Sequence, residues 1–116
     1  MKILITGGEG FIGKHTARAL RAADHEVVTL DKVGNPDILC DLSLDENYNL
    51  DHLDVILHLA AAAWRNANDR LIALHDTLYS TRAALHIAAK AKAAFIFASS
   101  ASIYGEPLYS PQDKHH

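Results

Sequence analysis

The stretch ILITGGEGFIG, residues 3–13, joins a short apolar run to four closely spaced glycines. Gly7, Gly10 and Gly13 match the pattern G-x-x-G-x-x-G, and Gly8, Gly10 and Gly13 match the overlapping pattern G-x-G-x-x-G. In such a motif one glycine permits a tight turn, Gly10 leaves room for a diphosphate near the backbone, and Gly13 lets the helix pack closely. The stretch therefore predicts a strand, a turn and a helix whose first amide groups face phosphate. The alternative is an ordinary glycine-rich strand-to-helix turn.

Further short apolar runs follow along the chain, at residues 26–30, 55–59 and 95–98, with a weaker run at 37–40. None of them alternates polar with apolar residues, which is typical of strands buried on both faces of a parallel sheet. Between the runs, residues 11–23 and 69–92 have helical spacing. In the second helix, the residues Leu71, Leu74, Leu78, Leu85 and Ala88 form one apolar stripe of the kind that faces a core.

Strands that alternate with helices predict an α/β fold, built from β-α-β units with right-handed crossovers. We expect a doubly wound, Rossmann-like parallel sheet of about five strands in the order 3-2-1-4-5, in three α-β-α layers. A chain of 116 residues is long enough for one such domain, and we assign it residues 1–116. The polar segment 43–54 is expected to be a loop or a short helix.

Composition and charge exclude several classes of protein. Eleven basic against fourteen acidic residues give a net charge of -3, and no basic block suggests nucleic-acid binding. No apolar run approaches the roughly 18 residues that span a membrane, and no signal peptide is recognisable. The single cysteine, Cys40, fits a reducing compartment, so we expect a cytoplasmic protein. The eight histidines lack metal-ligand spacing, and no metal site is predicted.

Asp31 ends the second predicted strand, 18 residues after Gly13. A carboxylate at this place accepts hydrogen bonds from the hydroxyls of an adenosine ribose and repels a 2′-phosphate. Asp31 thus favours NAD over NADP, although the adjacent Lys32 would soften that preference. A solvated turn aspartate is the alternative interpretation.

Together, several motifs resemble the extended short-chain dehydrogenase/reductases, the group of NAD-dependent sugar-nucleotide epimerases and dehydratases. The matching segments are residues 6–13, Asp31, Asp41-Leu42, the run HLAA at 58–61 and the run FIFASSASIYG at 95–105. They occur in the order and spacing of that family and span nearly the whole chain. The resemblance implies redox chemistry on a nucleotide sugar, with hydride passing to the nicotinamide.

The resemblance also implies roles for individual residues. The backbone amides of Phe11 and Ile12 would contact the pyrophosphate, and Ser100 would be the catalytic serine that positions the reacting hydroxyl. A simpler interpretation of Ser100 is turn chemistry after a strand. The cofactor-binding residues implied in total are Gly7, Gly8, Gly10, Phe11, Ile12, Gly13, Asp31, Asp41, Leu42, Leu59, Ala60 and Ala61.

One family motif is absent from the chain. No tyrosine is followed four residues later by lysine, the pair in which protonated lysine lowers the tyrosine pKa so that tyrosinate acts as base. We expect the chain to be the N-terminal, cofactor-binding part of a longer enzyme, to lack the substrate-binding half and to be inactive alone. The alternative is a non-catalytic nucleotide-binding or self-associating module. An uncovered sheet edge at residues 95–98 predicts a homodimer.

Overall fold

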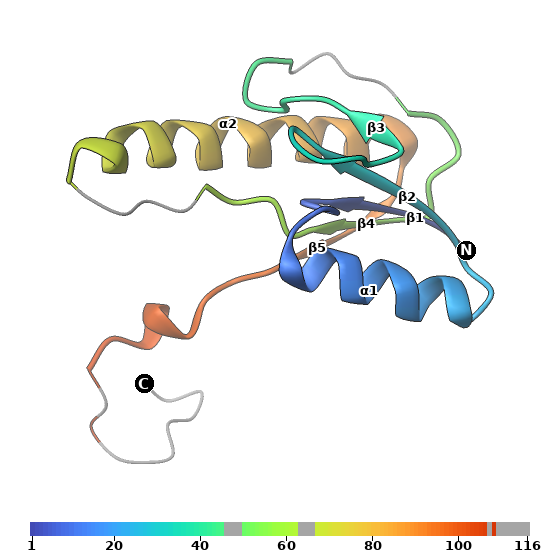
Figure 1. Cartoon of the computed structure of the whole chain (residues 1–116), viewed down its shortest axis with the longest axis horizontal. Coiled ribbons are helices and arrows are strands. Elements are labelled where there is room, and N and C mark those ends of the chain that lie inside the picture. Colours follow the sequence, from blue (N-terminus) through green and yellow to red (C-terminus); the bar gives the residue numbers. More distant parts are fainter. Residues whose placement is uncertain (46–49, 63–66, 107, 109–116) are drawn as a thin grey trace.

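A five-stranded parallel sheet forms the centre of the molecule (Figure 1). The computed structural model describes residues 1–45, 50–62, 67–106 and 108. The strands are β1 (Lys2–Thr6), β2 (Glu26–Asp31), β3 (Ile38–Leu39), β4 (Val55–His58) and β5 (Ala94–Phe97), and the helices are α1 (Phe11–Ala22), α2 (Ala67–Ala91) and the 3-10 helix η1 (Ala101–Tyr104). The strand order is β3-β2-β1-β4-β5 and every pairing is parallel, which confirms the predicted fold.

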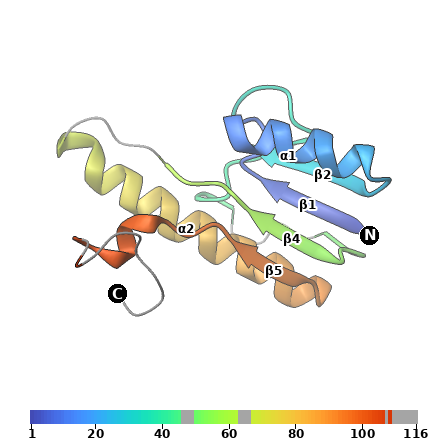
Figure 2. The same cartoon turned by 90° about the horizontal axis from the view of Figure 1, so that it is seen from below.

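The sheet is covered on both faces, with α1 on one side and α2 on the other (Figures 1 and 2). Alternate residues of a strand point to opposite faces, so β1 contributes to two separate cores. Ile3 and Ile5 pack with Ala17 of α1, whereas Leu4 packs with Ile87 of α2. This arrangement is the predicted three-layer α-β-α architecture.

The predicted inward stripe of α2 is wrong. Four of its five members are exposed, by 78% for Leu71, 57% for Leu74, 59% for Leu78 and 47% for Leu85. The helix instead buries a face composed mainly of small side chains, namely Ala73, Ala83, Ala84, Ile87 and Ala88. Small side chains let the helix approach the sheet closely, and the larger leucines then point outward. Only Ala88 of the predicted stripe faces the core.

The connection from β3 to β4 contains no helix in its described part, residues 40–45 and 50–54. Leu42 and Leu53 are buried in this connection and join the core on the α2 side of the sheet. None of the helices in the described part of the chain is long and apolar enough to cross a lipid bilayer.

Candidate functional site

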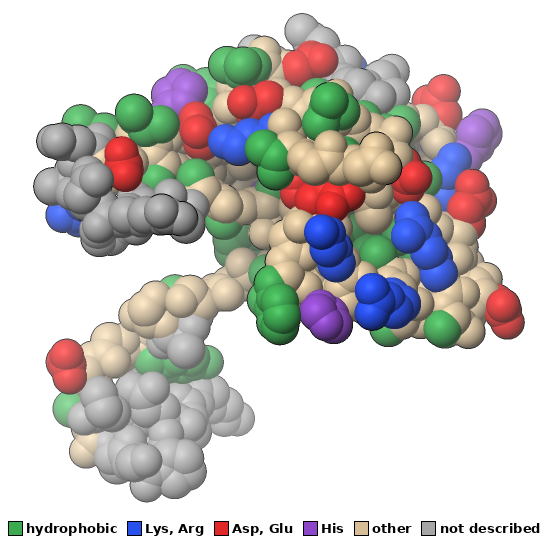
Figure 3. Space-filling view, viewed as in Figure 1, with side chains coloured by type: hydrophobic (Ala, Val, Ile, Leu, Met, Phe, Trp, Pro, Cys, Tyr) green, Lys and Arg blue, Asp and Glu red, His purple; other side chains and the backbone are tan. Residues whose placement is uncertain are grey.

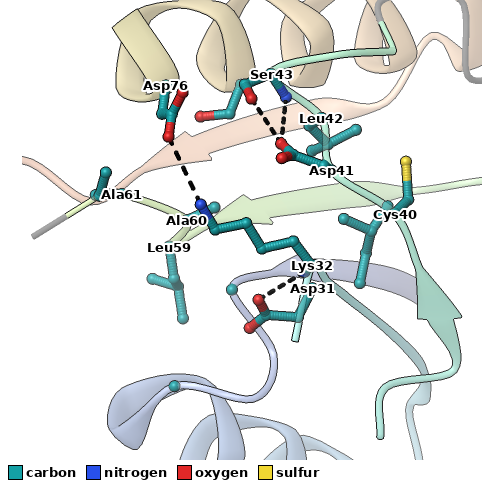
Figure 4. A pocket seen from close by; sticks show the side chains of 15 residues that line it. Asp31, Lys32, Cys40, Asp41, Leu42, Ser43, Leu59, Ala60, Ala61 and Asp76 are labelled. Atoms are coloured by element: carbon teal, nitrogen blue, oxygen red, sulfur yellow. Dashed lines mark hydrogen bonds and ion pairs between the residues drawn. The ribbon is translucent and has the colours of Figure 1, made fainter. Parts of the chain in front are cut away.

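A pocket opens at the carboxyl ends of the strands, where the chain reverses its direction across the sheet. Strands β1, β2 and β3 are added on one side and β4 and β5 on the other, so the reversal lies between β1 and β4. Open α/β sheets bind their ligands at this crevice. Figure 4 shows the pocket, which is lined by Gly7, Gly10, Leu30, Asp31, Lys32, Cys40, Asp41, Leu42, Ser43, Leu59, Ala60, Ala61, Ala62, Asp76 and Ser80.

Close backbone approaches require glycine in the turn after β1. Gly7 has a φ of +71°, and a Cβ atom there would lie 2.9 Å from the amide nitrogen of Ala60. At Gly13 a Cβ atom would overlap the carbonyl oxygen of Gly7 and lie 2.9 Å from the Cα atom of Gly8. The turn therefore packs against both the end of β4 and the first turn of α1.

The N-terminus of α1 lies beside this pocket. Gly10 is the N-cap residue, so no side chain caps the helix, and the first turn of α1 contains no acidic residue. The first amide groups of a helix have no acceptor within it, and they carry the positive end of the helix dipole. Phe11 and Ile12 are 82% and 64% exposed and do not line the pocket, so any part they take in the site is through the backbone amides at this helix end. This helix end is suited to an anion.

Asp31 and Asp41 are two of the three carboxylates among the described residues that line the pocket, the third being Asp76. Asp31 accepts hydrogen bonds from the backbone amides of Glu9 (3.0 Å, to Oδ2) and Lys32 (2.7 Å, to Oδ1). These amides hold the Asp31 carboxylate at the end of β2, and its remaining lone pairs can accept from hydroxyl groups. Asp41 uses Oδ1 to accept from the amide (3.0 Å) and hydroxyl (2.6 Å) of Ser43, which closes the turn after β3.

A buried polar network supports the wall formed after β4. The hydroxyl oxygen of Thr6 accepts hydrogen bonds from the amides of Leu59 and Ala60, each at 3.2 Å. Its own proton is therefore donated to Nδ1 of His58, 2.7 Å away. Nε2 of His58 then carries the ring proton and donates to the hydroxyl of Thr81 at 2.9 Å. Burial lowers the pKa of His58, which favours the neutral ring over the charged one.

Several residues of the pocket are not identified by the glycine motif or the family resemblance. Cys40, Ser43, Asp76 and Ser80 line it together with the predicted residues. Burial, together with the charges of Asp45 and Asp41, raises the pKa of the Cys40 thiol. No local pattern marks Asp76 or Ser80, because they reach the pocket only through the packing of α2 on the sheet.

Gly8 lies on the other side of the glycine turn and lines a second hollow, between α1 and β2. Figure 3 shows lysine and arginine side chains gathered over α1, with acidic side chains beside them. Lys14 pairs with Glu9 at 3.3 Å, and Arg21 pairs with Asp37 at 3.1 Å. The charges of this hollow therefore largely balance one another.

Ser100 does not line the pocket. Its hydroxyl lies 2.7 Å from that of Ser102 and accepts the backbone amide of Ser102 at 3.2 Å, which caps η1. This contact is the turn chemistry of the simpler interpretation, and a catalytic role for Ser100 stays a prediction. Within the part of the chain that the structure describes, no three histidine, cysteine, aspartate or glutamate side chains gather as a metal site would require.

This fold and site define a dinucleotide-binding α/β domain, and the comparison with protein families agrees. The chain belongs to the NAD dependent epimerase/dehydratase family, whose family model matches residues 3–116. Membership confirms the family resemblance carried by the sequence motifs.

Several of the curated relatives have names that specify nucleotide sugars, and another is a D-erythronate dehydrogenase of Haemophilus influenzae, 33% identical over 93% of this chain and 40% of that protein. The chain is 34% identical to the UDP-N-acetyl-alpha-D-glucosaminuronate decarboxylase of Bacillus cytotoxicus, over 97% of this chain and 41% of that protein. It is 33% identical to a putative UDP-glucose 4-epimerase of Methanocaldococcus jannaschii, over 98% of this chain and 43% of that protein. The chain thus spans about two-fifths of the length of these relatives and matches their N-terminal part.

Solved structures of the same family have the same fold. TunA, an NAD-dependent NDP-hexosamine 5,6-dehydratase of tunicamycin biosynthesis, superposes with a TM-score of 0.81 at 29% identity, over 97% of this chain and 41% of that one. The UDP-glucose 4-epimerase of Bifidobacterium longum, solved with NAD+ and UDP, superposes with a TM-score of 0.77 at 25% identity, over 98% of this chain and 41% of that one.

Proposed function

We propose that residues 1–116 form the cofactor-binding domain of an NAD-dependent enzyme that acts on a nucleotide sugar by hydride transfer. The observation that carries this proposal is the pairing of two features across one pocket. The Asp31 carboxylate stands at the end of β2, and the N-terminus of α1, which no side chain caps, lies beside it. One feature suits a ribose diol and the other suits a diphosphate.

In this proposal NAD lies across the carboxyl ends of the strands. The turn at Gly7, Gly8, Gly10 and Gly13 and the amides of Phe11 and Ile12 hold the pyrophosphate. Asp31 accepts the hydroxyls of the adenosine ribose, and Asp41 and Leu42 contact the adenine. Leu59, Ala60 and Ala61 line the path toward the nicotinamide. Eight of these residues line the same pocket, which supports the proposed cofactor contacts for them: Gly7, Gly10, Asp31, Asp41, Leu42, Leu59, Ala60 and Ala61.

The chemical step needs more than these residues. The relatives that carry out such reactions are more than twice as long as this chain, and their names specify nucleotide sugars. We assign the contacts to the sugar mainly to that further length, and we assign Ser100 the positioning of the reacting hydroxyl. Because the 116 residues contain no Tyr-x-x-x-Lys, we expect no turnover by this chain alone.

We further propose that the protein forms a homodimer. Self-association would also be the function of the chain under the alternative, a non-catalytic self-associating module. β5 is an edge strand, and its residues Ile96 and Phe97 are each 54% exposed. Figure 3 shows further hydrophobic side chains at the surface over α2. Exposed apolar area and open strand edges favour association with another chain. We place the protein in the cytoplasm, since its one thiol fits a reducing compartment.

Calorimetric titration of the chain with NAD, and separately with NADP, tests the cofactor assignment. We expect saturable NAD binding, weaker NADP binding, and a loss of about tenfold or more in NAD affinity in the Asp31→Ala variant, since two charge-assisted hydrogen bonds are lost. Absence of NAD binding by a chain that circular dichroism shows to be folded would overturn the assignment and favour the self-associating module.

A further inference from the structure

Lys32 reaches across the pocket from the end of β2 to α2. Its Nζ lies 3.6 Å from Oδ2 of Asp76. Figure 4 shows the lysine stem extended from beside Asp31 past Ala60, with the ammonium directed at Asp76. The side chains are 49% and 25% exposed, so the pair lies at the pocket mouth rather than in bulk solvent. Both residues line the pocket.

Lys32 is the only lysine or arginine among the described residues that line this pocket. The nearby Lys14 belongs to the other hollow and is paired with Glu9 at 3.3 Å. Among the described side chains that line this pocket, Lys32 is therefore the one that can offer a full positive charge to a cofactor phosphate at the ribose end. An ammonium there would oppose the repulsion that Asp31 exerts on a 2′-phosphate.

Asp76 directs this ammonium away from the ribose end. Its Oδ2 faces Lys32, while its Oδ1 lies 3.3 Å from Nδ1 of His75. The Asp76 carboxylate thus lies between Lys32 and the His75 ring, and each of its two oxygens faces one of them. As long as the pair is formed, the Lys32 charge is compensated and its stem is extended toward α2.

We propose that Asp76 is a cofactor-specificity residue. By holding Lys32 on α2, it keeps the ammonium from the position that a 2′-phosphate would occupy next to Asp31. The preference for NAD then depends on two carboxylates, one that repels the phosphate directly and one that sequesters the cation. This inference rests on the proposed function, since it assumes that the ribose lies at Asp31.

The test is a titration of variants with NAD and NADP at low ionic strength. Asp76→Asn keeps the shape of the side chain and removes its charge. We expect NADP to bind about three- to fivefold more tightly to this variant, because freeing a lysine from a partly exposed ion pair gives a gain of that size, while the NAD affinity changes by less than about twofold. The double variant Asp76→Asn with Lys32→Met should lose the gain. Glu26→Gln removes one acidic charge at the opposite end of β2 and should leave both affinities unchanged.

The single variant Lys32→Met gives a second reading that does not depend on the folding of Asp76→Asn. Because Asp76 already holds the ammonium, this variant should change NADP affinity by less than about twofold. A larger loss would mean that Lys32 reaches the phosphate in the unaltered chain and would overturn the inference. An unchanged NADP affinity in Asp76→Asn, or a gain that persists in the double variant, would also overturn it. If the unaltered chain binds NAD and only these shifts are missing, the inference fails while the proposed function stands.

Discussion

The hydroxyl of Thr6 and Nδ1 of His58, 2.7 Å apart, join the carboxyl ends of β1 and β4 at the point where the pocket opens. Both residues are buried, with exposures of 0% and 1%. Because Thr6 also accepts the amides of Leu59 and Ala60, this contact orders the backbone that forms one wall of the pocket. The interior of the protein and its candidate site therefore share one hydrogen-bond network.

The first prediction is that folding stability falls as the pH is lowered below 6.5. Burial lowers the pKa of His58 from its ordinary value of 6.5, so the unfolded chain binds a proton that the folded chain does not. The contribution of the neutral His58 ring to the free energy of unfolding is complete above pH 6.5. It is lost as the pH falls from 6.5 to the lowered pKa of the folded protein. Urea unfolding between pH 8 and pH 5 measures it. His58→Gln should flatten the pH dependence of the unfolding free energy, whereas His86→Gln, a change at an exposed position, should leave it as it is. An equal pH dependence in the unaltered chain and in both variants would contradict the assignment to His58.

The second prediction concerns the Thr6 hydroxyl. Thr6→Val keeps the shape of the side chain but leaves Nδ1 of His58 without a donor and the amide of Ala60 without its acceptor. Leaving buried polar groups unpaired costs about 1–3 kcal/mol. We expect a loss of that size in the free energy of urea unfolding, together with weaker dinucleotide binding. Thr6→Ser retains the hydroxyl and should keep most of the stability lost in Thr6→Val; an equal loss in both variants would show that the hydroxyl is not the cause.

The third prediction separates the roles of two glycines. In Gly13→Ala the new methyl group would overlap the Gly7 carbonyl oxygen, and we expect a loss of about 1–3 kcal/mol in folding free energy through overpacking. Gly10 has φ −72° and ψ 171°, which any residue adopts, and a Cβ there meets only the Gly7 oxygen at 3.3 Å. Gly10→Ala should therefore fold with a change below about 1 kcal/mol, yet bind NAD about tenfold or more weakly because the methyl group occupies the diphosphate approach. Thermal unfolding and calorimetry on both variants distinguish these effects, and the reverse ranking would contradict them.

The fourth prediction tests the two faces of α2. Ile87 is 1% exposed, and Ile87→Ala should cost about 2–4 kcal/mol by leaving a cavity. Leu78 is 59% exposed, and Leu78→Glu should change the unfolding free energy by less than about 0.5 kcal/mol while it reduces self-association in light scattering. A large destabilisation by Leu78→Glu at a concentration where the chain is monomeric would show that the leucine face is inward.

Patterns within the sequence predicted the features that are local or that repeat a general topology. The glycine spacing of residues 7–13 required a turn and a helix start, because other residues would clash there, as the contacts at Gly7 and Gly13 show. Continuous apolar runs identified strands buried on both faces, and right-handed crossovers restricted their order. The strand order and the position of Asp31 at the end of β2 follow from these rules.

By itself, then, the sequence determined the strands, the glycine turn, the sheet order and the candidate ribose carboxylate, because each depends on neighbouring residues or on a topology common to many proteins. Only the tertiary structure decided which face of α2 is buried. That helix has apolar residues on two sides, and the fit of alanines against the sheet, rather than their spacing, selects one. The pairs Thr6–His58 and Lys32–Asp76 belong to the same category, since each joins side chains far apart in the chain that meet only after the sheet and α2 have packed.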